Sequence, residues 1–291
     1  MIPASFEYFA PRSLEEALRL LDRHGDEAKL LAGGHSLLPL MKLRLAAPRY
    51  VIDLGRLKGM NAIREDSGGI VVGALATHAE IEQSALLRKA CPLLAETAAA
   101  IGDIQVRNRG TIGGSLAHAD PAADYPAAIL ALDAEMVATS VAGTRTIPAA
   151  EFFVDMLTSA LRPGEILTEI HLPALVARSG AAYAKLHQPA SGFAIVGVAA
   201  RVTLAAGKVA DVAVGVTGLS PKAFRASATE KALRGKKPDA KAIAAAVKSV
   251  AQGVEPLADL HASAEYRREM AAVFAQRALA RAVARAQGKQ A

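Results

Sequence analysis

The sequence predicts an α+β protein, in which groups of strands and helices follow one another along 291 residues. Three observations predict this class. The chain opens with a strand–helix–strand pattern, its middle contains a hairpin pattern, and its last third holds three apolar runs followed by alanine-rich helical segments. At about 150 residues per domain, the length suggests about two domains. The composition, 52% hydrophobic and 21% charged, rules out a disordered chain.

The first region covers residues 1–57 and is expected to form one lobe. Ser13 and Glu16 form a capping box, in which Ser13 accepts from the third helical amide and Glu16 reaches back. Leucines then recur at helical spacing until Gly25 ends the helix. Strands are expected at residues 6–9, 28–32 and 50–54, and the second of them runs directly into a Gly-Gly pair.

The second region covers residues 58–175 and is expected to form a second lobe. Thr77 and Glu80 form another capping box, which opens a short helix. Residues 101–116 are rich in glycine and are expected to be irregular. The remaining expected elements are strands at 70–73 and 165–172, helices at 91–100 and 126–132, and a hairpin at 135–147 with its turn at Gly143.

The third region covers residues 178–291 and begins at an expected linker, residues 178–180. Three apolar runs predict a three-stranded antiparallel meander, with a turn at residues 206–208. Two alanine-rich segments then predict helices. The strands are expected at 182–186, 194–204 and 209–217, and the helices at 240–251 and 262–286.

Cysteine content and hydropathy exclude several classes of protein. A single cysteine, Cys91, excludes an internal disulfide, a four-cysteine zinc site and an iron–sulfur cluster held by this chain alone. The apolar stretch at 192–200 ends at Arg201, far short of the ~20 residues of a membrane-spanning helix. The N-terminus lacks the pattern of a signal peptide, so we expect a cytoplasmic protein. Because this chain cannot hold an iron–sulfur cluster by itself, redox chemistry would need an organic cofactor or a partner.

The net charge of +6 is concentrated late in the chain. Arg277, Arg281, Arg285 and Lys289 recur every four residues, which places them along one helix face. This face is either solvated or a contact with a subunit or an anionic surface. A nucleic-acid-binding module is one hypothesis that the charge permits. The chain has no tryptophan and only 4% aromatic residues for base stacking, so we expect no nucleic-acid partner.

Two glycine-rich segments, residues 31–37 and 110–116, are the strongest candidates for a binding site. Each places paired glycines before a hydroxyl residue, Ser36 in the first segment and Ser115 in the second. Paired glycines let the backbone approach a ligand closely, and successive amides in such turns can hold an anion. Two such loops facing each other could hold a diphosphate, although each could also be a simple turn. Neither fits the Rossmann or the P-loop pattern.

Longer strings around these loops resemble the FAD-binding subunits of molybdenum hydroxylases, the xanthine dehydrogenase family. Residues 32–42 read AGGHSLLPLMK and resemble the first flavin loop of that family. Residues 105–115 read QVRNRGTIGGS and, with DPAAD at 120–124, resemble the second loop. Residues 263–270, SAEYRREM, and 277–279, RAL, resemble its C-terminal helix motif. By pattern, the chain is nearest to the medium subunits of the aerobic carbon monoxide dehydrogenase type.

This resemblance implies a vanillyl-alcohol oxidase/PCMH-type fold, in which two lobes cradle a non-covalent FAD beside a C-terminal domain. It also implies two partners, a molybdopterin-binding large subunit and a small subunit with two [2Fe-2S] clusters, in a dimer of heterotrimers. The flavin would pass electrons from the clusters to an external acceptor, because it can hold one electron or two. The complex would lie in the cytoplasm, with the inner membrane face as an alternative.

The resemblance also assigns residues to the flavin site. Asp124 matches an acidic position near the ribose, although it could simply cap a helix. Leu161 matches an apolar flavin contact but could be core, and Lys185 matches a lysine at the flavin's polar edge but could lie on the surface. Phe193 falls in front of the flavin ring, where relatives often have tyrosine. The other matched positions are Ile101 and Gly102 beside the ring, Ala32, Gly33, Gly34, His35, Ser36 and Leu37 in the first loop, and Val106, Gly110, Thr111, Ile112, Gly113, Gly114 and Ser115 in the second string.

No residue is assigned a catalytic or metal-binding role. His35 and His118 tempt a catalytic interpretation, but the histidines show no metal-binding spacing. A self-sufficient flavin oxidase of the same fold is the alternative function, and it would need its own substrate pocket.

Overall fold

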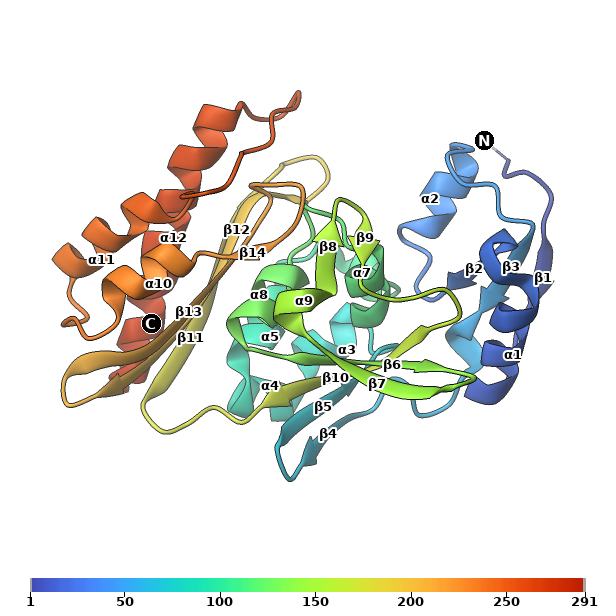
Figure 1. Ribbon diagram of the computed structural model, residues 1–291, viewed down its shortest axis with the longest axis horizontal. Helices are drawn as coiled ribbons and strands as arrows, with labels where there is room; N and C mark the ends of the chain where they lie inside the picture. The colour runs from blue at the N-terminus through green and yellow to red at the C-terminus, as the bar shows by residue number, and fades with distance from the viewer. Residues whose placement is uncertain (1, 290–291) are drawn as a thin grey trace.

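The computed structural model describes residues 2–289 and arranges them around three main sheets and one short hairpin (Figure 1). The N-terminal sheet lies at one end of the molecule, a five-stranded sheet with its helices occupies the middle, and the C-terminal sheet with its long helix lies at the other end. A separate hydrophobic core accompanies each main sheet. The α+β class expected from the sequence is confirmed.

The N-terminal sheet is parallel and carries the first glycine loop directly after one of its strands. Its order is β1–β3–β2, and helix α1 buries Ala17, Leu18 and Leu21 beside it. Ser13 accepts from the amide of Glu16, as expected, but the Glu16 carboxylate accepts from the amide of Arg12 rather than that of Ser13. The elements are β1 (Glu7–Phe9), α1 (Leu14–His24), η1 (Gly25–Glu27), β2 (Ala28–Leu31), α2 (Leu37–Lys42), β3 (Tyr50–Asp53) and η2 (Leu54–Arg56).

The five-stranded sheet is antiparallel, in the order β4–β5–β10–β6–β7. The expected hairpin and the Thr77–Glu80 capping box are both present. The strands are β4 (Ile63–Asp66), β5 (Gly69–Gly73), β6 (Glu135–Ser140), β7 (Gly143–Pro148) and β10 (Ile166–Pro173), with a small hairpin of β8 (Phe153–Asp155) and β9 (Thr158–Ser159). The helices are α3 (His78–Gln83), α4 (Ala85–Ala90), α5 (Pro92–Ala99), α6 (Ile104–Arg107), α7 (Ile112–His118), α8 (Tyr125–Ala131) and α9 (Ala149–Phe152).

The expectation that residues 101–116 are irregular was wrong. This segment contains α6 and the start of α7, and each helix has a side-chain cap. Asp103 accepts from the amide of Val106 at 2.9 Å, and Thr111 accepts from the amide of Gly114 at 3.1 Å. These caps, together with the burial of Ile112 and Gly113, outweigh the low helix propensity of glycine.

The C-terminal sheet is an antiparallel meander with helix α12 on one face. Ser179 already belongs to the first strand, so the expected linker at 178–180 is shorter than proposed. A fourth strand of two residues, β14, joins the three expected ones. Gly180 allows close helix packing, since a Cβ there would lie 2.2 Å from the Ala282 carbonyl oxygen. The elements are β11 (Ser179–His187), β12 (Ala194–Ala205), β13 (Lys208–Thr217), β14 (Phe224–Arg225), α10 (Ser227–Leu233), α11 (Ala240–Ala246), η3 (Val247–Ser249) and α12 (Ala264–Ala286).

The other face of this sheet packs on the middle of the molecule. A Cβ on Gly215 would lie 2.1 Å from the carbonyl oxygen of Ala127, so β13 and α8 meet backbone to backbone. Tyr183 and Ala199 of the C-terminal sheet extend the core of the five-stranded sheet. Among residues 2–289, no helix has the length and hydropathy needed to span a bilayer.

Candidate functional site

The structure brings the two glycine loops together. Gly33, which follows β2, lies against the second loop so closely that a Cβ would be 2.1 Å from the carbonyl oxygen of Arg109. Gly34 has a φ of +79°, a conformation that glycine adopts without strain. His35 also reaches the second segment, because its Nε2 lies 3.4 Å from the carbonyl oxygen of Gln105. Glycine at position 33 is therefore required for the two loops to meet, and glycine at position 34 suits the left-handed turn that follows it.

The backbone amides of the two loops are used differently. In the first loop, the amides of Gly33, Gly34, His35 and Ser36 donate to no acceptor within residues 2–289. In the second, Ile112 donates to Ala76 at 3.0 Å, Gly113 donates to Ala74 at 2.8 Å, and Gly114 donates to the Thr111 hydroxyl. The expectation that both loops offer inward-pointing amides is thus wrong for these three residues, because Ile112 and Gly113 bond to the segment after β5 and Gly114 bonds to the cap of its own helix.

His78 supports the second loop from behind. Its amide donates to the Gly110 carbonyl oxygen at 3.0 Å, and its Nε2 would lie 2.5 Å from a Cβ on Gly110. The side chain is 5% exposed, and burial lowers the pKa of the imidazole from 6.5 to about 4, so it is neutral at pH 7. Its Nδ1 and the hydroxyl of Tyr125 are buried without a hydrogen-bond partner in the described part of the chain, and the two rings lie 5.3 Å apart.

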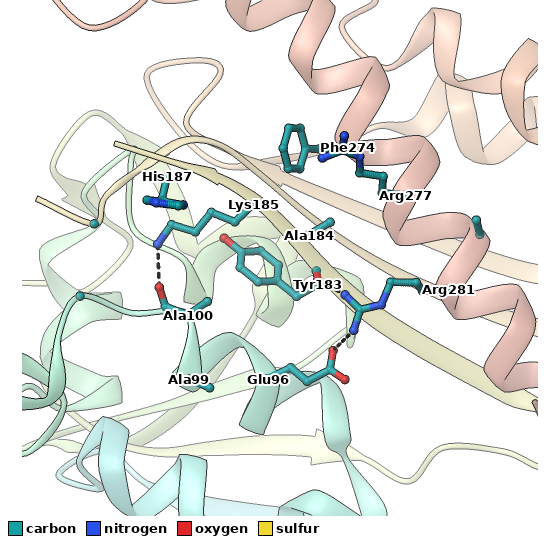
Figure 2. Close-up of a pocket in the computed structure, with 13 residues that line it drawn as sticks. Glu96, Ala99, Ala100, Tyr183, Ala184, Lys185, His187, Phe274, Arg277 and Arg281 are labelled. Atoms are coloured by element: carbon teal, nitrogen blue, oxygen red, sulfur yellow. Dashed lines mark hydrogen bonds and ion pairs between the residues drawn. The ribbon is translucent and has the colours of Figure 1, made fainter. Parts of the chain in front are cut away.

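Asp124, Lys185 and Tyr183 form a buried polar cluster between the middle of the molecule and β11. The carboxylate of Asp124 accepts from the Tyr183 hydroxyl at 2.6 Å and lies 2.8 Å from Nζ of Lys185. The same ammonium donates to the Ala100 carbonyl oxygen at 2.9 Å (Figure 2). Burial raises the pKa of the Asp124 carboxyl, and Lys185 acts in the opposite direction. Burial also raises the pKa of the Tyr183 hydroxyl well above its ordinary value.

These contacts exclude a simple helix cap as the role of Asp124 and a surface position for Lys185. Asp124 precedes α8 but makes no side-chain capping bond there. The side chain of Lys185 is only 6% exposed, so it is not a surface lysine. Tyr183, which the sequence analysis missed, lies two residues before Lys185 on the same strand. The two side chains therefore point to the same face of the sheet. This two-residue spacing was the sequence signal that could have placed Tyr183 beside Lys185.

Of the other residues expected near the flavin ring, Gly102 and Phe193 belong to two loops in contact, whereas Ile101 and Leu161 pack against a core. Gly102 contacts Val106 and lies opposite Gly192, where a Cβ would be 3.1 Å from the Gly102 Cα. Phe193 follows Gly192 and is half exposed. Ile101 and Leu161 are half-buried and pack against the core of the five-stranded sheet. The structure therefore joins the loop of Phe193 to residues 101–106, and Leu161, like Ile101, packs against the core while remaining partly exposed.

The remaining candidate residues are distributed around the two loops. Ala32 faces Gly114 across the loops, and Leu37 begins α2. Ser115 is half-buried near the start of α7, and His118 ends that helix. The described residues contain no group of side chains that could hold a metal ion.

This geometry fits FAD. The first loop offers donors that face no acceptor of the chain, as a diphosphate requires. Lys185 is buried and is held by the buried Asp124 carboxylate, so it is a positioned donor at the site. Glycines at the loop contact leave no room for side chains between the two loops.

Comparison with known proteins agrees with this fit. The family described as the FAD binding domain in molybdopterin dehydrogenase matches residues 4–175, and the CO dehydrogenase flavoprotein C-terminal domain matches residues 181–282. The chain therefore belongs to the molybdopterin dehydrogenase family of FAD-binding proteins, and the resemblance drawn from its motifs is confirmed. It is an oxidoreductase subunit whose cofactor is FAD.

Proteins whose names give different substrates are similar to this chain over almost its full length. It is 40% identical to the carbon monoxide dehydrogenase medium chain of Hydrogenophaga pseudoflava, over 98% of this chain and 99% of the relative. It is 41% identical to subunit alpha of the 6-hydroxypseudooxynicotine dehydrogenase complex of Paenarthrobacter nicotinovorans, over 98% and 97%. A solved structure of carbon monoxide dehydrogenase from H. pseudoflava superposes with a TM-score of 0.95 at 43% identity, covering 98% and 99% of the two chains.

Proposed function

We propose that this chain is the electron-exit subunit of a molybdenum hydroxylase complex of the carbon monoxide dehydrogenase type. It receives electrons from [2Fe-2S] clusters of a small subunit and passes them to an external acceptor. A molybdopterin-binding large subunit oxidises the substrate, and the complex is a dimer of heterotrimers in the cytoplasm. The observation that carries the proposal is the meeting of the two glycine loops, with unpaired amides in the first, beside the buried Lys185–Asp124 pair.

Each part of the chain has a defined task in this proposal. The amides of the first loop hold the diphosphate, and the second loop with His78 behind it fixes the position of the first. Lys185 donates to the polar edge of the flavin, and Asp124 holds the ammonium in place. Bound FAD supplies a carrier that takes one or two electrons. The three cores support a division into units at 1–57, 58–175 and 178–291, although Ile166 joins the first core and Tyr183 and Ala199 join the second.

The flavin is bound without a covalent link in this proposal. Cys91 is the single cysteine of the chain. It is buried, and burial raises the pKa of its thiol to about 11. A thiol in this state is a poor nucleophile.

Gly33→Ala tests the proposal, because the added Cβ would meet backbone at 2.1 Å and force the loops apart. Gly68→Ala is the matched control, since a Cβ there would meet nothing within 4 Å. After reconstitution with FAD and removal of free flavin, we expect the wild type and G68A to retain the visible absorbance of oxidised flavin. G33A should lose it while keeping its circular dichroism spectrum.

Two results would contradict the proposal in different ways. A wild-type chain with no flavin absorbance after reconstitution would refute FAD binding. Bleaching of the bound flavin by an organic substrate of the isolated chain would instead favour the self-sufficient oxidase.

A further inference from the structure

Tyr183 reaches from the C-terminal sheet into the middle of the molecule, and no role proposed above uses it. Its side chain is only 5% exposed and belongs to the core of the five-stranded sheet. Its hydroxyl donates to Oδ1 of Asp124 at 2.6 Å. A buried tyrosine hydroxyl usually finds a partner, and a hydrogen bond to a carboxylate is among the stronger kinds. This bond therefore joins the C-terminal sheet to a residue assigned to the flavin site.

Gly197 on β12 keeps space for this hydroxyl. It is paired with Lys185 across the two strands. A Cβ on Gly197 would lie 2.2 Å from the hydroxyl oxygen of Tyr183 and 2.8 Å from Cγ2 of Thr217. A side chain at position 197 would push the phenol away from Asp124, so the hydrogen bond depends on glycine there.

The C-terminal sheet and its adjoining loops also hold the backbone that leads to Asp124. The amide of Gly218 donates to the carbonyl oxygen of Pro121 at 2.7 Å, and the amide of Ala194 donates to that of Ala122 at 3.1 Å. With this backbone fixed, the main freedom left to Asp124 is rotation of its side chain. The hydrogen bond from Tyr183 restricts that rotation.

The direction of the Lys185 ammonium follows from the position of Asp124. An ammonium has three N–H donors. One faces the Asp124 carboxylate, at 2.9 Å from Oδ2, and another faces the carbonyl oxygen of Ala100 at 2.9 Å. Figure 2 shows the side chains of Tyr183 and Lys185 leaving β11 on the side of Ala100. Because the fold sets the positions of both acceptors, it also sets the direction of the third donor.

The hydrogen bond from Tyr183 also favours the charged form of Asp124. Burial raises the pKa of this carboxyl, while Lys185 and the Tyr183 hydroxyl lower it. Tyr125 of α8 interacts with the same carboxylate, but its own pKa lies well above the ordinary value, so it stays neutral. Loss of the Tyr183 hydroxyl would therefore raise the pKa of Asp124, and a neutral Asp124 would hold the ammonium less firmly.

We propose that Tyr183 is a positioning residue for the flavin site, which fixes the Asp124 carboxylate so that the third N–H of Lys185 is directed at FAD. In this role Tyr183 acts through the Asp124–Lys185 pair and need not touch the cofactor. The inference rests on the proposed function, because it takes Lys185 as the donor to the polar edge of the flavin.

The test measures the dissociation constant of FAD for the full chain, from a titration followed by flavin fluorescence. Tyr183→Phe keeps the ring and removes only the hydroxyl, and it should weaken FAD binding about tenfold, the effect of one hydrogen bond to a charged group. Gly197→Ala keeps the hydroxyl but displaces it, so it should weaken binding to a similar degree. Tyr266→Phe, at an exposed position, and G68A are the matched controls and should bind FAD as the wild type does.

Two readouts separate positioning from a general effect on packing. Lys185→Met removes the donor that Tyr183 is proposed to orient, so Y183F added to K185M should weaken FAD binding no further. Between pH 8 and pH 5, FAD binding by Y183F should begin to weaken at a higher pH than in the wild type, because Asp124 takes up a proton earlier. A loss of packing alone would add to the effect of K185M and leave the pH profile unmoved.

Three results would overturn the inference while leaving FAD binding by this chain intact. They are wild-type affinity in Y183F, additive losses in the double variant, and pH profiles that coincide for Y183F and the wild type. Circular dichroism without FAD shows which variants fold, and Y183F decides alone if G197A does not. A wild-type chain that binds no FAD is recognised before any variant is compared, and that result refutes the proposed function together with this inference.

Discussion

The buried His78 makes a specific prediction about acid stability. Its imidazole has a pKa of about 4 in the folded chain, against 6.5 for a free histidine. Between these two pH values the unfolded chain binds a proton at His78 and the folded chain does not. Stability contributed by neutral His78 is therefore complete above pH 6.5 and declines as the pH falls toward 4. At about 1.4 kcal/mol per pH unit, the total loss is about 3 kcal/mol.

The assay is urea unfolding of the chain without FAD, followed by circular dichroism, at pH values from neutral down to about 4.5. His78→Asn removes the titrating group, so its unfolding free energy should fall with pH by about 2–3 kcal/mol less than that of the wild type. Carboxylates that lose their partners in acid, such as Glu165 beside Arg145, contribute to both proteins and cancel in the difference. His261→Asn, at an exposed position, is the control and should follow the wild type. Parallel pH profiles for the wild type and H78N would refute the reasoning.

Two further substitutions test the contacts that hold the site together. Asp124→Asn leaves the buried Lys185 ammonium without its counter-charge and should lower the unfolding free energy by about 3 kcal/mol. The double variant with Lys185→Met should recover most of that loss. Equal losses in the single and double variants would count against a buried ion pair. Gly180→Ala places a Cβ 2.2 Å from the Ala282 carbonyl oxygen and should lower the unfolding free energy measured in urea by about 2 kcal/mol. The control G68A should be as stable as the wild type. Wild-type stability of G180A would show that α12 can move away freely.

The sequence predicted most helices and strands because their signals are local. The cap at Ser13 and the capping box at Thr77 were read directly from spacing, and the hairpin at 135–147 was marked by its turn glycine. The short helices α6 and α7 were not predicted, because the local signal there was ambiguous. Their caps at Asp103 and Thr111 lie among glycines, whose low helix propensity concealed them.

The candidate site was predicted only in part, because its decisive contacts join distant segments. The Asp124–Tyr183 hydrogen bond spans 59 residues, and the His35–Gln105 contact spans 70. No spacing rule links such positions. The structure was therefore needed to identify His78, to show that Tyr183 donates to Asp124, and to separate Lys185 from an ordinary surface lysine.

The unequal use of amides in the two glycine loops leads to a test at single-residue resolution. The amides of Gly33, Gly34, His35 and Ser36 have no acceptor in residues 2–289, so they should exchange rapidly with solvent in the chain without FAD. Those of Ile112 and Gly113 already donate to Ala76 and Ala74 and should be protected from the outset.

Amide exchange measured by NMR with and without FAD can separate the two loops. If the first loop grips the diphosphate, FAD should slow exchange at residues 33–36 far more than at 112 and 113. Protection that appears mainly in the second loop would contradict the assignment of the first loop as the principal anion site. The meeting of the loops would then serve only to join the two lobes, because close packing alone needs glycine at position 33 whether or not its amide binds a ligand.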